Sequence, residues 1–266
     1  MNRIDAKFKE LRKKRKKALI LYMTAGDPSL GRNAELIAAF EKEGVDFVEL
    51  GVPFSDPLAD GVVIQGASQR ALKRGTTLKG ILALVKKVRK KSELPILLMS
   101  YLNPILNYGL DHFAASARKA GVDGLIVPDL PPEEGKEVSA AMKKRQLHLV
   151  YLLAPTSGPK RLKLVAKASK GFIYYVSLTG VTGMRKALPR ELRRNILATR
   201  KNSRVPVCVG FGISTPEQAR AAARAADGVI VGSAIVRALA QYPRLNAAAF
   251  SRRFVRPFAR ALGKAV

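Results

Sequence analysis

The segment VPVCVGFGISTPEQARAAARAADGVIVG, residues 205–232, contains the repeating unit of the fold. It begins with the apolar run VPVCVG and continues, after a glycine-containing loop, with Thr-Pro, which is typical of the first turn of a helix. Residues 216–226 have helical spacing, and DGVIVG (227–232) is a second apolar run. The segment therefore predicts a strand, a helix and a second strand parallel to the first.

The same alternation extends along the whole chain. Eight short apolar runs are continuous, as expected of strands that helices cover on both faces. These runs lie at residues 18–24, 45–51, 95–101, 123–129, 147–153, 171–177, 205–210 and 227–232. Amphipathic segments lie between them at 31–44, 78–91, 109–121, 133–145 and 216–226.

This pattern predicts an α/β fold, a (β/α)8 TIM barrel, as a single domain over residues 1–266. Residues 1–17 are expected to form an extra N-terminal helix packed on the barrel. A doubly wound open sheet is the alternative. It is disfavoured because TAGDPS (24–29), after the first predicted strand, lacks the GxGxxG pattern.

The chain is strongly basic, with 48 Lys and Arg against 20 Asp and Glu and a formal net charge of +28. This charge could coat the outer surface, or it could attract a polyanion or a phosphorylated substrate. Clusters such as RKKRKK (12–17) and KKVRKK (86–91) are spread along the chain, and aromatic residues are only 6%, so nucleic-acid binding is not expected.

One cysteine, Cys208, and the lack of a long apolar segment or signal-peptide pattern predict a cytoplasmic protein without a membrane span. No metal site is expected, because Cys208 and the two histidines lack metal-ligand spacing.

Loops that contain glycine follow the last three predicted strands, with the sequences TGVTG (179–183), GFGIS (210–214) and GSAIV (232–236). In a barrel these loops lie at the catalytic end, where late loops often bind phosphate. Glycine lets backbone N–H groups approach an anion closely, although it also serves simple tight turns. The candidates for a phosphate site are Gly183, Gly212, Gly232 and Ser233.

Three carboxylates lie in ELGVPFSDPLADG, residues 49–61. Glu49 shares one face of its predicted strand with Phe47, so its side chain could point into the barrel mouth, or it could cap a loop or form an ion pair. Apolar neighbours in the mouth would raise its pKa towards neutrality. Asp56 and Asp60 precede Pro and Gly, and on pattern alone both are turn formers.

Several motifs in order resemble the tryptophan synthase alpha subunit family, over nearly the whole chain. They are ELGVPFSDPLADGVVIQGAS (49–68), GLIVPDLPPEE (124–134), GVTGMR (180–185), GFGISTPEQ (210–218) and GSAIV (232–236). The resemblance implies a barrel that cleaves indole-3-glycerol phosphate to indole and glyceraldehyde 3-phosphate by a retro-aldol reaction, with no metal or organic cofactor in this chain. A stand-alone indole-3-glycerol-phosphate lyase is the alternative.

The resemblance also implies roles for individual residues. Glu49 corresponds to the catalytic acid and base, and Asp60 to the carboxylate that stabilises positive charge on the indole nitrogen. Thr182 falls on a loop that closes over the site. The positions matched to substrate binding are Tyr22, Tyr101, Ile126, Leu152, Tyr174, Thr182, Gly183, Phe211, Gly212, Gly232 and Ser233.

Family members assemble as αββα heterotetramers and pass indole through a tunnel to a beta subunit that contains pyridoxal phosphate. The resemblance therefore implies a beta-subunit partner here. The matching interface positions are Pro53, Asp56, Asn103, Pro128, Asp129 and Pro131. A basic scaffold for nucleic acid is a third reading, but it leaves Glu49 and the glycine loops without a role.

Overall fold

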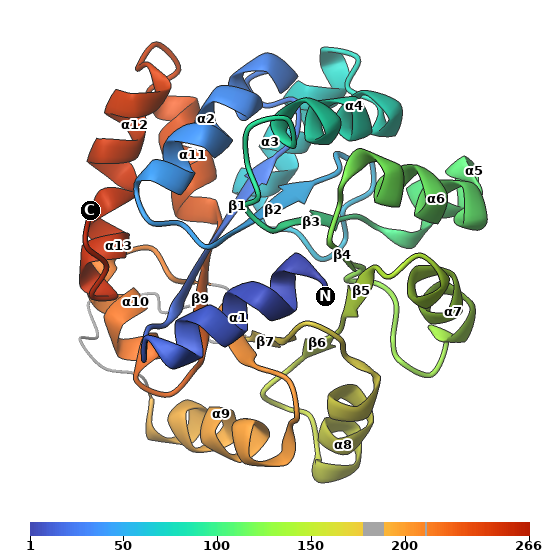
Figure 1. Cartoon of the computed structure of the whole chain (residues 1–266), viewed down its shortest axis with the longest axis vertical. Helices are drawn as coiled ribbons and strands as arrows, with labels where there is room; N and C mark the ends of the chain where they lie inside the picture. Colours follow the sequence, from blue (N-terminus) through green and yellow to red (C-terminus); the bar gives the residue numbers. More distant parts are fainter. Residues whose placement is uncertain (178–188, 211) are drawn as a thin grey trace.

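The computed structural model describes residues 1–177, 189–210 and 212–266, and each of the eight apolar runs forms a strand in it (Figure 1). The run at 147–153 is divided into two short strands around Tyr151. The strands are β1 (Ala18–Thr24), β2 (Phe47–Gly51), β3 (Ile96–Met99), β4 (Gly124–Ile126), β5 (His148–Val150), β6 (Leu152–Leu153), β7 (Ile173–Val176), β8 (Val207–Gly210) and β9 (Gly228–Val231).

The strands form a parallel barrel. Their order within the described chain is β5-β4-β3-β2-β1-β9-β8-β7-β6. Because β5 and β6 are separated only by Tyr151, the two ends of this order belong to one segment, and the sheet closes on itself. The N–H of Tyr174 donates to the carbonyl of Tyr151 at 3.1 Å, which ties the closing segment to β7. The TIM-barrel prediction is confirmed.

Helices surround the strands (Figure 1). The predicted helix after β8 begins at Pro216, where Thr215 and Gln218 form a capping box, with the N–H of Gln218 donating to the Thr215 hydroxyl at 3.3 Å. The helices are α1 (Arg3–Lys13), α2 (Leu30–Lys42), α3 (Val62–Lys73), α4 (Leu78–Val88), α5 (Leu102–Tyr108), α6 (Leu110–Ala120), α7 (Lys136–Lys144), α8 (Pro159–Ala168), α9 (Arg190–Asn202), α10 (Pro216–Ala223), α11 (Ser233–Gln241), α12 (Ala247–Phe254) and α13 (Arg256–Ala261).

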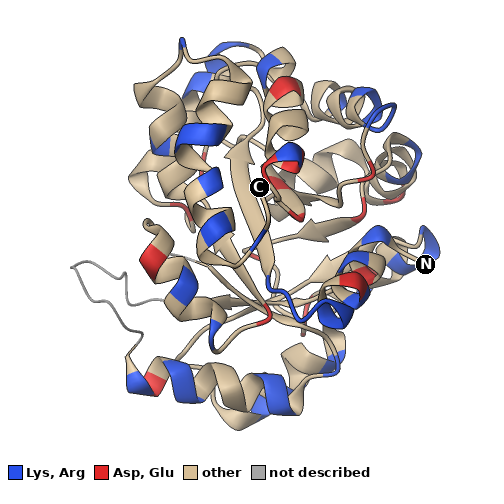
Figure 2. Ribbon diagram, turned by 60° about the vertical axis from the view of Figure 1, so that its left-hand side comes forward, with Lys and Arg blue, Asp and Glu red and all other residues tan. Residues whose placement is uncertain are grey.

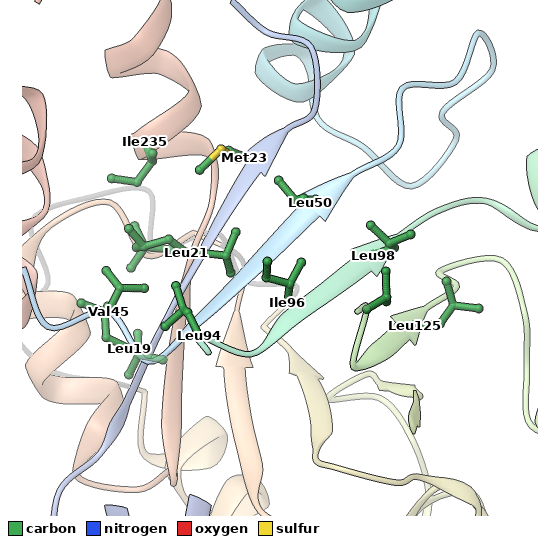
Figure 3. Close-up of a cluster of buried hydrophobic side chains, with 14 of the residues drawn as sticks. Leu19, Leu21, Met23, Val45, Leu50, Leu94, Ile96, Leu98, Leu125 and Ile235 are labelled. Carbon is green, nitrogen blue, oxygen red and sulfur yellow. The ribbon is translucent and has the colours of Figure 1, made fainter. Parts of the chain in front are cut away.

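Successive strand residues alternate between two cores. Leu19, Leu21 and Met23 of β1 join the outer core between the strands and the helices (Figure 3). Ile20 and Tyr22 of the same strand join a smaller core inside the barrel. This alternation is the period of two that a β-strand imposes on its side chains. Every second side chain of β1 therefore points into the barrel interior, and the others point towards the helices.

Helix α1 closes the N-terminal end of the barrel (Figure 1). Its buried side chains Ile4, Phe8 and Leu11 lie one helical turn apart, on one face. The Phe8 ring lies 4.7 Å from the Phe47 ring at the start of β2, measured between centroids. The extra N-terminal helix predicted from the sequence therefore seals the barrel end opposite the expected catalytic mouth.

Three aspartates at this N-terminal end, of which Asp46 and Asp123 are buried and Asp227 is partly exposed, are all paired. Asp46, Asp123 and Asp227 each precede a strand, and each accepts a hydrogen bond from a backbone N–H at the start of a neighbouring strand. Asp46 accepts from Leu19 N–H at 2.7 Å. Asp123 accepts from Ile96 N–H at 2.8 Å, and Asp227 accepts from Val207 N–H at 3.0 Å. Each also pairs with a cation, respectively Lys264, Arg89 and Arg200. Pairing of this kind compensates the cost of burying a charge.

Lys and Arg occupy most of the outer helices and greatly outnumber the acidic residues on the surface (Figure 2). Among the residues that the structure describes, no helix has the length and apolar character needed to span a membrane.

Candidate active site

A cavity of about 280 Å³ opens at the C-terminal ends of the strands. Its lining comes from β1, β3, β7 and β9, from the start of α3 and the loop before it, from the loops after β8 and β9, and from α11. The residues are Tyr22, Asp60, Gly61, Val62, Val63, Ile64, Met99, Tyr174, Gly212, Ile213, Ile230, Gly232, Ser233 and Arg237. The cavity therefore brings together several predicted residues from distant parts of the sequence.

Glu49 is fully buried on β2, directly opposite Tyr22 in the register of β1 and β2. Neither of its carboxylate oxygens has a hydrogen-bond partner among the described residues. Burial raises the pKa of Glu49 to about 8. Among the described residues, Glu49 thus forms no ion pair and caps no loop with its side chain, so the alternative interpretation of the sequence does not match the structure.

Glu49 itself does not line the cavity, whereas its neighbour Tyr22 does. The charges of Glu49 and Asp60 both act on Tyr22, adding to the dominant effect of burial in raising the pKa of its hydroxyl. The same two carboxylates and burial raise the pKa of Tyr174. Both acids therefore lie within electrostatic reach of the same pair of tyrosines.

Asp60 lies in the cavity wall just before α3. Burial raises its pKa to about 6, and a hydrogen bond with the Tyr101 hydroxyl opposes this effect. The Tyr101 hydroxyl also accepts a hydrogen bond from Ala59 N–H at 2.8 Å. Tyr101 thus holds the Asp60 loop in place.

Two glycines make room for the tyrosine hydroxyls. A Cβ atom on Gly51 would lie 2.0 Å from the Tyr22 hydroxyl oxygen, and one on Gly210 would lie 2.4 Å from that of Tyr174. Each tyrosine thus leans over the last residue of a neighbouring strand, where only glycine fits. Neither glycine was predicted from the sequence, because the pattern of one strand does not reveal which side chain of a neighbouring strand packs against its last residue.

The opposite side of the cavity has the features of an anion site. Gly212 has φ +75°, a conformation that favours glycine. Helix α11 begins at Ser233 after Gly232, both of which line the cavity, and no side chain of the described residues caps its first N–H groups. A helix N-terminus with free N–H groups attracts anions. The predicted positions Gly212, Gly232 and Ser233 come together here.

Arg237 also lines the cavity and was not predicted. It lies four residues after Ser233, on the same face of α11, and helical side chains lean towards the N-terminus. It is exposed and has no ion pair with a described residue. The sequence feature that could have predicted Arg237 is its position four residues after Ser233 in a helix, which places both residues on the same face.

Other predicted positions lie elsewhere or cannot be placed. Ile126 belongs to the interior core and Leu152 packs against it, and neither is among the residues that line the cavity. Thr182, Gly183 and Phe211 lie outside the described residues.

The predicted interface positions surround the Asp60 loop and the neighbouring strand ends. Asp56, Asn103 and Asp129 are exposed, Pro128 and Pro131 are partly exposed, and Pro53 is buried. Asp129 accepts hydrogen bonds from Leu102 N–H at 3.1 and 3.2 Å and so links the loop after β4 to the start of α5.

Beside these positions, two apolar side chains are largely exposed, Leu58 at 95% and Val62 at 82%. An exposed apolar pair of this kind is typical of an interaction surface.

No group of three or more potential metal ligands occurs among the residues described, and Cys208 is buried in the interior core. At the mouth, Asp60 lines the cavity and Glu49 lies buried next to the lining residue Tyr22, so two carboxyl groups with different pKa values occur near the candidate anion site. Pairs of this kind are a sign of acid and base catalysis.

The sequence model of the family described as tryptophan synthase alpha chain matches residues 8–261. A tryptophan synthase alpha chain from Geobacter sulfurreducens is 50% identical over 266 residues, covering 100% of this chain and 99% of the relative. The crystal structure of tryptophan synthase subunit alpha from Legionella pneumophila superimposes with a TM-score of 0.92 at 40% identity, covering 99% of both chains.

A chain in the crystal structure of a tryptophan synthase complex from Pyrococcus furiosus is also similar, with a TM-score of 0.84 and 36% identity, over 92% of this chain and 99% of that one. Fold, motifs and identity agree over nearly the full length. The chain belongs to the tryptophan synthase alpha chain family.

Proposed function

We propose that this lyase cleaves indole-3-glycerol phosphate into indole and glyceraldehyde 3-phosphate by a retro-aldol reaction. The observation that supports this most strongly is the buried Glu49 carboxyl, which lacks a partner among the described residues. Asp46, Asp123 and Asp227 of the same barrel are all paired with cations. A sequence that pairs its structural acids and leaves one unpaired at the mouth favours a catalytic role for that acid.

The two pKa values suit two different tasks. With a pKa of about 8, Glu49 is protonated at neutral pH and can donate a proton to indole C3. Protonation of C3 puts positive charge on the ring nitrogen. Asp60, with a pKa of about 6, is ionised at neutral pH and would stabilise that charge where it develops.

The carboxylate that Glu49 leaves behind can then take the proton of the hydroxyl group next to C3. The bond between C3 and the glycerol carbon breaks, its electron pair returns to the ring, and the hydroxyl carbon becomes the aldehyde. Glu49 thus ends protonated as it began. Because Glu49 lies beside the cavity lining, this role requires its side chain to change rotamer and turn towards the substrate.

The substrate phosphate is assigned to Gly212, Gly232 and Ser233, with Arg237 as a cation at the same side of the cavity. Distance across the cavity would then place the indole ring near Asp60 and the two tyrosines. Both proton transfers use the Glu49 carboxyl group, so the proposal needs no cofactor in this chain.

The proposal includes a beta subunit that contains pyridoxal phosphate, in an αββα assembly. The similar Pyrococcus chain comes from a tryptophan synthase complex. Leu58 and Val62 would supply an apolar contact beside the predicted interface positions.

The direct test measures indole released from indole-3-glycerol phosphate by the isolated chain and by the chain with its beta subunit. We expect slow release alone and strong stimulation by the partner. Full turnover that the partner leaves unchanged would support the stand-alone lyase instead. If indole forms under neither condition, the assigned reaction is wrong.

A further inference from the structure

A second cavity, of about 550 Å³, lies at the N-terminal end of the barrel, away from the candidate active site. It is bounded by the end of α1, the segment that leads into β1, and the residues between α9 and β8. The proposed reaction leaves this cavity without a role.

The cavity is far more basic than the rest of the chain. Six of its twelve lining residues are Lys or Arg, whereas these residues are 48 of 266 in the whole sequence. At the share found in the whole sequence, twelve residues would include about two. Among the described residues, the cavity at the barrel mouth has Arg237 as its one basic lining residue. The share of Lys and Arg in this lining is thus well above the average of the whole chain. The six are Arg12, Arg15, Lys16, Lys17, Arg200 and Arg204.

Two of these cations already have partners. Arg200 pairs with Asp227, the only acidic residue of the lining, with its Nη2 2.7 Å from Oδ1. Lys17 donates to the Ala226 carbonyl at 2.7 Å. The other four, Arg12, Arg15, Lys16 and Arg204, have no side-chain hydrogen bond or ion pair with a described residue. Mutual repulsion among four such cations is unfavourable until an anion binds.

The backbone at Arg15 adds an independent observation. Arg15 has φ +53°, just after the end of α1, where Lys16 N–H bonds back to the Leu11 carbonyl at 2.9 Å. This position of a helix end favours glycine, and a side chain with a Cβ is strained there. The residue at this position is nevertheless an arginine, and it lines the cavity.

We propose that this cavity binds a small anion that carries two or more phosphate groups. A single phosphate carries a charge of about −1.5 to −2 and would leave part of the four unpaired charges uncompensated. Val205 and Pro206 form a partly exposed apolar edge of the lining, against which an organic group of the ligand can pack. The chemical class is a nucleotide polyphosphate or an inorganic polyphosphate.

The experiment is titration calorimetry on the full chain with tripolyphosphate, ATP and inorganic phosphate as separate probes. Saturating glycerol 3-phosphate is present throughout, so that the mouth site is occupied. We expect one tripolyphosphate or ATP per chain, with affinity that falls as salt is added, and inorganic phosphate binding at least about tenfold more weakly. Tighter binding of ATP than of tripolyphosphate assigns a nucleotide, and equal binding assigns the phosphate chain alone.

Two variants locate the site. Replacing Arg12, Lys16 and Arg204 together by Gln should weaken binding at least about a hundredfold. The control variant removes the same charge from the exposed surface at and just after α4, by replacing Lys86, Lys87 and Lys90 by Gln. This control should bind as the wild type does. Arg15→Gly should weaken binding while the thermal midpoint stays equal or rises, which a purely structural role of Arg15 does not predict.

Equal binding by the cavity variant and its control would overturn the proposal, as would no saturable binding of either polyphosphate. Tighter binding of single-stranded RNA, lost in the same variants, would also overturn it and make the cavity part of a nucleic-acid surface. If the triple variant unfolds, Arg15→Gly decides alone, and unchanged affinity in that variant counts against the site.

Discussion

The buried state of Glu49 makes the stability of the protein depend on pH in a way that one substitution should remove. Burial raises its pKa from 4.5 to about 8 in the folded chain. The folded state therefore holds this proton more tightly than the unfolded state does. The stabilising contribution is fully present below pH 4.5 and is lost as the pH rises through this window towards 8.

The size of the effect follows from these two pKa values. At about 1.4 kcal/mol for each pKa unit, Glu49 should lower the free energy of unfolding by about 4 kcal/mol between pH 5 and pH 9, with about 2.5 kcal/mol of this reached at pH 7. Glu49→Gln keeps the shape of the side chain and cannot ionise. The difference in unfolding free energy between the variant and the wild type should therefore grow by about 4 kcal/mol over this range.

Urea unfolding at pH 5, 7 and 9, followed by circular dichroism, measures this difference. Glu137→Gln, on the exposed face of α7, is the matched control and should follow the wild type within about 0.5 kcal/mol at each pH. Other titrating groups cancel because they are common to all three proteins. If the Glu49→Gln and wild-type values change in parallel, the carboxyl is not held in an apolar site and the reasoning is wrong.

Three further substitutions test other parts of the site. Asp60→Asn should lower kcat for indole formation about a hundredfold or more, since it removes charge opposite the indole nitrogen; unchanged kcat contradicts that role. Arg237→Ala should raise KM about tenfold to a hundredfold with partial rescue in Arg237→Lys, and an unaltered KM would mean that this cation does not meet the phosphate. Leu58→Asp should weaken affinity for the beta subunit at least about tenfold by calorimetry, and equal affinity removes Leu58, 95% exposed, from the interface.

The sequence predicted the barrel because continuous apolar runs and glycine-punctuated helices are local features. The run at 147–153 shows the limit of this approach, since only the closed sheet reveals that it divides around Tyr151 to close the barrel. Helices such as α3 and α5 were missed, because α3 follows a loop that contains Pro53 and Pro57, and α5 has only 7 residues and contains Pro104.

The site was predictable in part. Because side chains alternate along a strand, the sequence placed Glu49 on the same inner face as Phe47. The lack of a hydrogen-bond partner for Glu49 among the described residues depends on three-dimensional packing, which the spacing of residues does not reveal. Asp60 was a turn former on pattern alone, and only the family motif pointed to its place in the cavity. Gly51 and Gly210 depend on tyrosines from neighbouring strands, and Arg237 depends on how α11 faces the cavity.

The most direct test of the central claim is the rate of indole release by Glu49→Gln in complex with the beta subunit, together with its affinity for indole-3-glycerol phosphate. The proposed proton transfers predict that release falls at least about a thousandfold while substrate affinity stays within about threefold of the wild type, because the amide keeps its shape and loses the proton. Wild-type kcat in this variant would contradict the account.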